Sequence, residues 1–341
     1  PSDMTNATKT LALVFAGSVA LALATSWDGS GTSSAAFQSS LLAVDTSAVQ
    51  AVRIDRSDGP SVRLERGDDG WTVAPADTAA AYPASTQAVG NLLRSLPNLE
   101  VGAVTTRQPD KHPRYGVDST GTRIAMMGAG GEVLGELIVG RTRMRRPQRQ
   151  GRAQNPMQRM RRRRGTPVTY VRSPDRPDVY SVEQSFRTVT SRSIEDWRDK
   201  QLWAIDRAQV RRIDLRYPAD SSFTVRRAAP GDTAATAAPD TWLSAGDTLR
   251  TSEVSSMLRT LSSPSANSFV EGTTPDSFGD PLYTIRLRTA DGSRRTLRLR
   301  PGPDGQHYVA VADGFPYVVQ LRKGPWDNSV LRGRSALLKN N

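Results

Sequence analysis

The chain offers few side chains that could form a catalytic or metal-binding centre. Its 341 residues include no cysteine and two histidines, His112 and His307. The lack of cysteine excludes disulfide frameworks, thiol nucleophiles, and zinc or iron–sulfur sites that depend on thiolate ligands. Two histidines leave little material for a hydrolytic triad or a histidine metal cage. We therefore expect no catalytic residues, no metal and no cofactor, and we expect that the protein is not an enzyme.

The acidic pairs and the histidines have simple structural interpretations. Asp68/Asp69 and Glu195/Asp196 fall in predicted turns or at a helix end, where solvated charge is the usual state. His112 lies in a polar turn and His307 opens a predicted strand, so the two are expected at the surface or in turns. Paired catalytic carboxylates would need a cleft between them, and a sequence does not show one.

A glycine cluster and the tryptophans also favour structural roles. Gly128, Gly130 and Gly131 superficially suggest a phosphate loop, but their spacing fits no phosphate-binding pattern and no lysine follows. A hairpin turn is predicted there instead. Tryptophans recur near the predicted domain edges, where packing in the core or between domains accounts for them: Trp71, Trp197, Trp203, Trp242 and Trp326.

The net charge of +12 comes almost entirely from one segment. Between residues 141 and 164 there is no acid, and eleven arginines occur: Arg141, Arg143, Arg145, Arg146, Arg149, Arg152, Arg159, Arg161, Arg162, Arg163 and Arg164. Without these eleven charges the rest of the chain carries only +1. The body of the protein is therefore expected to be nearly neutral.

Two interpretations of this segment stay open. Its composition cannot bury enough apolar surface to fold alone, so it could be a solvated, flexible insertion. It could instead be an arginine clamp for lipid head groups or for the acidic surface of a membrane protein subunit, because guanidinium binds phosphate and carboxylate bidentately. Nucleic acid is disfavoured as a partner, since no aromatic residue interleaves the run to stack on bases.

The amino-terminal segment is a candidate membrane anchor. Residues 11–27 carry no charge, and as a helix they would span ~25 Å of a ~30 Å hydrocarbon core. The anchor residues are Leu11, Val14, Phe15, Val19, Leu21, Leu23 and Trp27. A cleaved signal peptide is the alternative, because Ala22-Leu23-Ala24 fits a cleavage pattern. We expect an uncleaved, single-pass anchor in the inner (cytoplasmic) membrane, with the bulk of the chain on the periplasmic, extracytoplasmic side.

The remainder of the chain is predicted to contain two copies of one unit. The apolar positions of residues 43–54 recur 161 residues later, and those of residues 92–96 recur after 165 residues. Offsets that change only at predicted loops are typical of a duplication followed by insertions. A period this long indicates two domains rather than a solenoid.

Each copy predicts strands, then one helix, then more strands. Val52/Ile54 alternate as in a half-buried strand, and Ile213/Leu215 repeat them. Two helices follow at equivalent places, with apolar residues at i, i+3, i+4 and i+7: Val89, Leu92, Leu93 and Leu96, then Val254, Met257, Leu258 and Leu261. Residues 181–200 are predicted to form a further helix that bridges the copies.

These patterns predict an α+β fold: an N-terminal transmembrane helix, then two repeated β-rich units, each an antiparallel sheet with a packed helix. The expected boundaries are an anchor at 1–27, a flexible linker at 28–40, a first repeat at 41–200, a second repeat at 201–333 and a tail at 334–341. The arginine-rich segment 141–164 would form a hairpin insertion between a strand ending at Val139 and one starting at Val168.

Several short motifs together carry a family resemblance. They include the sequences at 69–73, 115–118 and 137–140, and Trp197-Arg198-Asp199-Lys200-Gln201-Leu202. In this order they resemble the domain of unknown function 4340 family, over nearly the whole of residues 41–331. The resemblance implies an accessory protein encoded beside membrane transport systems, and it supplies no catalytic residues. The arginine-rich insertion departs from the family pattern.

We therefore expect a non-enzymatic, membrane-anchored accessory or scaffold subunit that braces a larger membrane complex from the periplasmic side. That complex would be an ABC-type transporter or a photosynthetic or respiratory assembly. The alternative is an extracytoplasmic enzyme or binding protein that acts on an anionic envelope polymer, guided by the arginine run.

Overall fold

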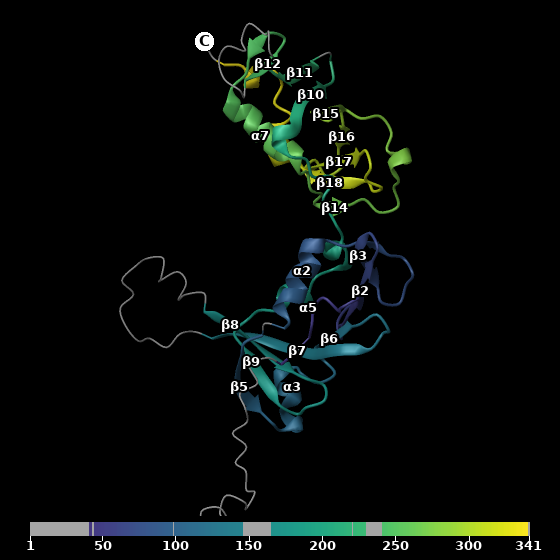
Figure 1. The fold of residues 1–341 in the computed structure, drawn as a ribbon, viewed down its shortest axis with the longest axis vertical. Coiled ribbons are helices and arrows are strands. Elements are labelled where there is room, and N and C mark those ends of the chain that lie inside the picture. The colour runs from purple at the N-terminus through teal and green to yellow at the C-terminus, as the bar shows by residue number, and fades with distance from the viewer. Residues whose placement is uncertain are drawn as a thin grey trace, which may run out of the picture.

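The computed structural model describes residues 41–42, 44–97, 99–145, 165–219, 221–229 and 241–339. The expected anchor residues and the arginines from Arg146 to Arg164 lie outside these ranges, so they stay predictions. Among the helices within these ranges, none is both long and apolar enough to cross a membrane. The described chain forms two β-rich units stacked along the long axis and joined by a single linker (Figure 1).

An antiparallel sheet of nine strands forms the first unit. Its spatial order is β4-β3-β2-β1-β6-β7-β8-β9-β5. The strands are β1 (Ala51–Asp55), β2 (Val62–Gly67), β3 (Gly70–Pro75), β4 (Tyr82–Pro83), β5 (Val101–Thr106), β6 (Thr122–Met127), β7 (Val133–Arg145), β8 (Thr166–Arg172) and β9 (Val179–Val182).

The second unit is built on another antiparallel sheet of nine strands, in the order β13-β12-β11-β10-β15-β16-β17-β18-β14. The strands are β10 (Val210–Arg216), β11 (Phe223–Arg227), β12 (Trp242–Ser244), β13 (Asp247–Thr248), β14 (Ser268–Phe269), β15 (Tyr283–Thr289), β16 (Arg294–Pro301), β17 (His307–Ala312) and β18 (Val319–Arg322).

Helices in the described residues are few and short. The two longest are α2 (Thr86–Ser95) and α7 (Thr251–Ser262), one for each unit. The others are α3 (His112–Tyr115), α5 (Arg187–Thr190), α6 (Ile194–Trp197) and α8 (Lys323–Ser329), with 3-10 turns at Pro109–Lys111, Arg207–Gln209, Pro275–Ser277 and Ser335–Leu337. The expectation of two antiparallel sheets accompanied by helices is confirmed.

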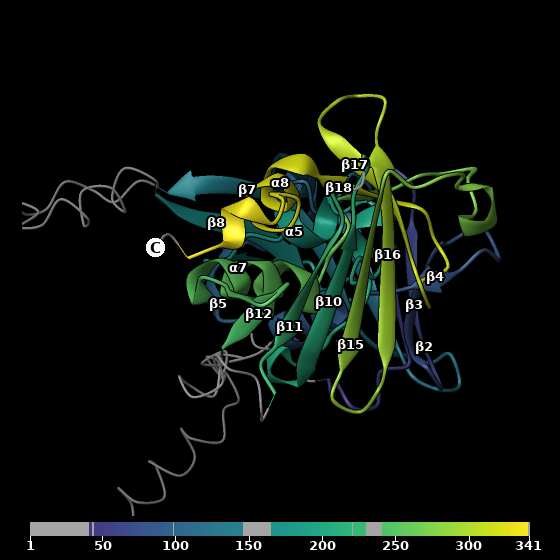
Figure 2. The ribbon, with the colours of Figure 1, turned by 90° about the horizontal axis from the view of Figure 1, so that it is seen from above.

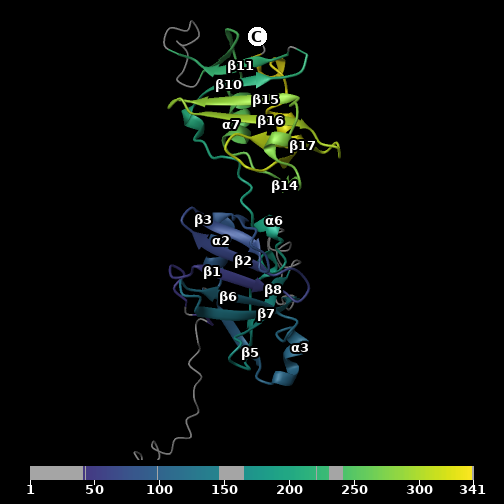
Figure 3. The same cartoon turned by 90° about the vertical axis from the view of Figure 1, so that its right-hand side faces the viewer.

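The second sheet repeats the connectivity of the first. Strands β10 to β13 correspond to β1 to β4, and β14 to β18 correspond to β5 to β9, in the same spatial order. In each unit the long helix comes between these two groups of strands. The registers also correspond, since Ile54 pairs with Val62 in one sheet and Leu215 with Phe223 in the other. Figure 3 shows the two sheets one above the other.

Each sheet has its own apolar core, on the face that its long helix covers. Alternate residues along the strands point inward and are fully buried, including Ile54 and Leu64 in the first unit and Ile213 and Leu297 in the second. Helix α2 buries Val89 and Leu92, and α7 buries Val254, Met257, Leu258 and Leu261. Figure 2 shows α7 lying against β10 and β11. The apolar residues of the strands, which recur every second position, thus pack against those of the helix, which recur with a period of 3.6, to form the core of each unit.

The outermost strands of both sheets are very short or irregular. Strands β4, β13 and β14 have two residues each, and β4 contains Pro83. Strand β5 has six residues, but its pairing with β9 shifts register twice. Neither sheet therefore presents a long, regular free edge in the described chain.

Two sequence expectations are corrected. Residues 181–200 do not form one helix: β9 takes the first two, and the short helices α5 and α6 follow, because Ser193 caps a new helix start. Strand β7 does not end at Val139 but continues to Arg145, where it pairs with Thr166 of β8. Backbone hydrogen bonds to β8 sustain this polar extension, which apolar alternation does not reveal.

Candidate functional site

The linker between the sheets is bonded to both of them. Ser193 caps α6 by accepting a hydrogen bond from the Asp196 N–H. Beyond the helix, the backbone of residues 197–199 exchanges hydrogen bonds with residues 83–85 of the first unit. The Lys200 carbonyl then accepts from Ala266 N–H, and Leu202 N–H donates to the Pro264 carbonyl of the second unit. The linker backbone is therefore hydrogen-bonded to both the first and the second unit.

Arg198 lies at the centre of this crossing and is 4% exposed. Its guanidinium carbon is 3.5 Å from the ring centroid of Phe269, 4.0 Å from that of Tyr82 and 4.6 Å from that of Tyr317. Tyr82 belongs to the first unit, whereas Phe269 and Tyr317 belong to the second. Cation–aromatic contacts of a desolvated guanidinium are worth about 2 kcal/mol or more. We name these four residues the arginine cage.

A single carboxylate completes the surroundings of the cage. Arg198 Nη1 lies 3.0 Å from Oε1 of Glu271, whose side chain is mostly exposed. Nearby, Glu195 accepts a hydrogen bond of 2.9 Å from the Phe269 N–H, and Lys200 donates to the Asn267 carbonyl at 3.2 Å. Because an arginine stays charged at any ordinary pH, the cage suits permanent positioning rather than proton transfer.

A polar cleft of about 620 Å³ opens beside the cage, between the start of α2 and the linker. Its polar groups are largely used within the protein. Lys200 pairs with Asp196 at 3.2 Å, Gln201 donates to Ser263 at 2.7 Å, and Arg192 stacks 4.6 Å from Trp197. Burial works against the carboxylate of Asp196, but hydrogen bonds from Ser193 and Lys200 outweigh it and lower its pKa. The side chains that line this cleft therefore stabilise the junction between the units.

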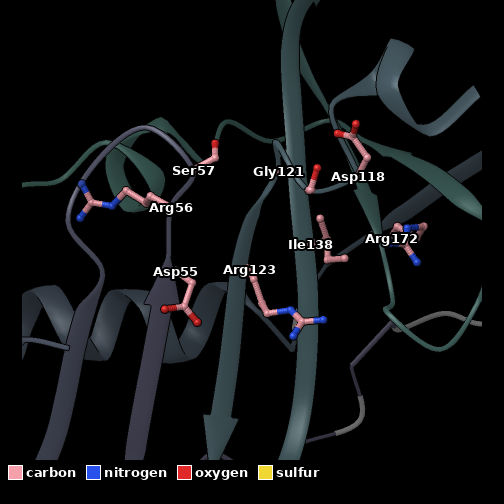
Figure 4. Close-up of a pocket in the computed structure, with 9 residues that line it drawn as sticks. Asp55, Arg56, Ser57, Asp118, Gly121, Arg123, Ile138 and Arg172 are labelled. Carbon is pink, nitrogen blue, oxygen red and sulfur yellow. The ribbon is translucent and has the colours of Figure 1, made fainter. Parts of the chain in front are cut away.

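A second cavity, of about 370 Å³, lies at one end of the first sheet (Figure 4). Three arginines line it, Arg56, Arg123 and Arg172, together with Asp55 and Asp118. Figure 4 places Asp55 on β1, Arg123 on β6 and Ile138 on β7, with Asp118 on the loop beyond them. The lining therefore offers both signs of charge, with a surplus of one cation.

Backbone carbonyls hold two of these arginines. Arg172 donates to the carbonyls of Val117, Ser173, Pro174 and Arg176 at 3.1 to 3.2 Å. Arg56 donates to the Arg192 carbonyl at 2.6 Å. Burial lowers the pKa of both guanidinium groups, and the charge of Arg123 adds to this at Arg172. The Thr120 hydroxyl lowers the pKa of Asp118. This cavity fits a small anionic ligand better than an acid–base pair.

The structure places some of the predicted arginines but does not bring them into either cavity. Arg141, Arg143 and Arg145 are exposed on the extension of β7, and Arg145 forms an ion pair of 2.7 Å with Glu183. The other eight lie outside the described residues. Whether the segment binds an anion stays a prediction.

The histidines do not meet in one site. His112 is buried rather than exposed, with Nε2 2.9 Å from the Pro177 carbonyl oxygen. His307 lies 2.5 Å from Asp304, and the hydrogen bonds from its ring and backbone lower the pKa of Asp304 to about 2. His112 is therefore not at the surface: it is the first residue of α3, directly after the 3-10 turn Pro109–Lys111, and its side chain is buried.

Other sequence expectations are confirmed. Gly128, Gly130 and Gly131 form the turn between β6 and β7, with Gly131 at a φ of 80°. Asp68 and Asp69 are exposed in the turn between β2 and β3. Four tryptophans are buried in the cores or at the junction: Trp197, Trp203, Trp242 and Trp326. Glu195 and Asp196 lie on the short helix α6, and Asp196 is exposed, as expected for a helix end. Their carboxylates also accept hydrogen bonds at the linker, Glu195 from Phe269 N–H and Asp196 from Ser193 and Lys200.

Sequence reasoning missed the arginine cage. Arg198 was visible only as part of a family motif, and its aromatic neighbours are far away in the chain. Among the described residues, no group of three or more histidines, cysteines and carboxylates is placed to hold a metal ion.

Comparison with known proteins gives one match. Neither the curated proteins nor the solved structures return a significant relative. Residues 164–280 match a family model, and they include β8, β9, the linker with Arg198, and the second unit up to the loop that precedes β15. The resemblance expected from the sequence is thereby confirmed over these residues: they match the family described as domain of unknown function (DUF4340).

Proposed function

We propose that the protein is a non-enzymatic, membrane-anchored accessory subunit that braces a larger membrane complex from the extracytoplasmic side. In this proposal residues 1–27 are an uncleaved anchor in the inner membrane, and the two sheets extend from it as a strut. The family resemblance favours an ABC-type transport system, and a photosynthetic or respiratory assembly fits the same physical features. The arginine-rich segment 141–164 would contact lipid head groups or an acidic subunit.

The arginine cage is the observation that supports this proposal. A brace must keep a fixed length and direction, and a flexible linker between its units would prevent that. Arg198 contacts Tyr82 of one unit and Phe269 of the other while it is almost completely buried. A swivel of one unit would expose these contacts to water and separate the stacked groups. The junction therefore favours a single relative orientation.

Distances between the units provide the test. The chain has no cysteine, so Asp68→Cys and Asp313→Cys place one spin label on an exposed turn of each unit without background labelling. Double electron–electron resonance on the full chain in detergent should give one narrow distance distribution. Arg198→Gln should broaden it, whereas Arg187→Gln, an exposed arginine nearby on α5, should not.

Circular dichroism of both variants shows whether the sheets remain folded. A distribution that is broad in the parent chain, or equally narrow with Arg198→Gln, would contradict the proposed strut. The proposed anchor has its own test: the native protein should retain residues before Ala24 and should resist extraction by alkaline carbonate. A mature chain that begins at Thr25 would contradict the anchor.

A second candidate function is that of an extracytoplasmic binding protein or enzyme that acts on an anionic envelope polymer. The cavity lined by Arg56, Arg123 and Arg172 favours it, because guanidinium groups recognise carboxylate and phosphate. Titration with an acidic glycan fragment should then shift the NMR signals of these three residues. Substitution of Arg172 by Gln should abolish the shifts, and a response confined to residues outside the cavity would count against this function.

A further inference from the structure

The second sheet carries a row of arginines across its exposed face. Arg226 of β11 pairs with Arg212 of β10, Arg212 pairs with Arg288 of β15, and Arg288 pairs with Arg294 of β16. Figure 3 shows β10, β15 and β16 side by side in this sheet. Directly paired residues of neighbouring strands point to the same face and lie about 5 Å apart. We name these four residues the arginine row.

The row lies on the side of the sheet opposite to the core. Ile213, Leu287 and Leu297 alternate with the arginines and are buried. Arg212, Arg288 and Arg294 are exposed. Further outward arginines on the same strands extend the positive face: Arg216, Arg286, Arg298 and Arg300. Residues 270–280 reach over the adjoining strands, where Phe278 packs on Val309 and Val311, so the open area lies over β10, β11, β15 and β16.

This arrangement is unfavourable for the isolated protein. Like charges directly opposite each other in a sheet destabilise it. Arg212 forms an ion pair of 2.8 Å with Asp214. Within the part of the chain that the structure describes, Arg288 and Arg294 take part in no ion pair, and neither do the four outward arginines that extend the face. The repulsion would be relieved by a negative partner.

The first unit shows that the fold does not need the row. The same register positions there are Glu65, Ala51, Met127 and Val133. On β1, β2 and β6 of that sheet each outward arginine is matched with an acid: Arg53 with Asp55, Arg63 with Glu65, and Arg123 with Glu136. An equivalent sheet therefore forms with its charges balanced.

We propose that the arginine row is a docking surface for an acidic protein, a carboxylate-rich face of a subunit in the complex. The identity of the partner as a complex subunit rests on the proposed bracing function; the site and its ligand chemistry do not. A sheet holds guanidinium groups at regular intervals, which suits carboxylates fixed on a folded surface, and arginine pairs with each of them bidentately.

Lipid and nucleic acid fit this face less well. Surface-binding proteins insert aromatic or aliphatic side chains into the interfacial layer of a membrane. In the described chain the large exposed hydrophobics are Val104, Val133, Met144 and Leu282, and none lies on β10, β11, β15 or β16. The outward neighbours of the row are Thr224, Asp214 and Thr296, which offer no ring on which a base could stack.

Residue-resolved modification tests the site directly. Phenylglyoxal reacts with accessible arginines, and mass spectrometry reports the rate at each position of the full chain in detergent. A poly-glutamate peptide should slow the reaction of Arg212, Arg288 and Arg294 several-fold. Arg53, Arg63 and Arg107, which are at least partly exposed and are ion-paired in the first unit, serve as matched controls and should react at unchanged rates. Because the rate is measured for each residue, protection of the arginine row is distinguished from protection of the arginines in residues 141–164.

Affinities of variants then distinguish the partner class. In a background with Arg161 to Arg164 replaced by Gln, the triple variant Arg212→Gln/Arg288→Gln/Arg294→Gln should bind poly-glutamate about tenfold more weakly, or about 1.4 kcal/mol. Replacement of the same three by Lys should weaken peptide binding because the planar fork is lost. The control variant Arg53→Gln/Arg63→Gln/Arg107→Gln removes as many charges, all from ion-paired arginines of the first unit, and should bind like the parent.

Three results would overturn the proposal. Equal losses for the row and control variants would show general charge attraction. Tighter binding of phosphatidylglycerol vesicles or single-stranded DNA than of poly-glutamate, lost in the row variant, would assign the surface to lipid or nucleic acid. No protection of the row by any probe would remove the site. None of these results bears on the distances between the units, so the bracing function is judged separately.

Discussion

The two sheets share strand order and register, but their outward faces differ. In the first unit each outward arginine on β1, β2 and β6 has an acidic partner. In the second unit the equivalent face carries the arginine row, where Arg212 pairs with Asp214 and where Arg288 and Arg294 form no ion pair within the described residues. The inward positions have stayed apolar in both, because the cores require it. The fold therefore constrains the residues on the inward side of each strand, while the charges on the outward side can differ between the units.

The cores should contribute equally in the two units. Leu137 and Leu297 occupy equivalent buried positions on β7 and β16. Replacing either with Ala should lower the free energy of unfolding of its own unit by about 2–5 kcal/mol, through lost burial and a cavity. Differential scanning calorimetry of the two variants checks this. If one substitution proved neutral, the equivalence of the cores would fail.

The junction should couple the two units. Arg198→Gln removes the cation from the cage and should cost about 2 kcal/mol of stability between the units. We expect the calorimetric transitions of the two units to separate further than in the parent chain. Arg187→Gln is the matched control, and an unchanged separation with Arg198→Gln would mean that the backbone bonds of the linker suffice.

The outward faces should respond in opposite ways to one acidic substitution. Arg288→Glu replaces two repulsive pairs, with Arg212 and Arg294, by attractive ones, and should raise stability by about 0.2–1 kcal/mol for each pair. Met127→Glu at the equivalent position faces Ala51 and Val133 and should bring no gain. Urea unfolding at low and high salt measures both. A gain that survives high salt would not be electrostatic.

The smallest effect is expected at the hairpin where the units differ most in length. Between β16 and β17, Asp304 accepts hydrogen bonds from Gln306 and His307, and its pKa falls from 3.8 to about 2. A depressed folded pKa stabilises the protein above the unfolded pKa, and this contribution fades as pH falls towards 2. Asp304→Asn should therefore be destabilising at neutral pH and less so near pH 2, as thermal unfolding across pH would show. A pH-independent difference would contradict this role.

Much of the fold could be predicted from local patterns. Alternation at Val52/Ile54 and Ile213/Leu215 marks strands, and the spacing of Val254 and Leu258 marks a helix, because burial on one face imposes those periods. The polar end of β7 could not be predicted in this way, since its backbone pairs with β8 whatever its side chains are. The two short helices after β9 were missed because a serine cap interrupts a sequence that is otherwise helical in character.

The candidate sites were harder to predict because they depend on contacts between distant residues. Arg198 meets Tyr82 and Tyr317 only once both units are folded. The arginine row depends on cross-strand register, which charge arithmetic along the chain does not reveal. Outside residues 141–164 the positive and negative charges nearly cancel in number, yet they segregate in space.

The short outer strands determine how copies of this protein can lie against one another. The unpaired backbone groups of an exposed edge strand can pair with an edge strand of another copy, which leads to aggregation. Here Pro83 blunts one edge, two-residue strands end others, and the irregular pairing of β5 bends the last. Copies can therefore stand next to one another without merging into a continuous sheet. Edge-to-edge polymerisation through the described sheets is thereby disfavoured.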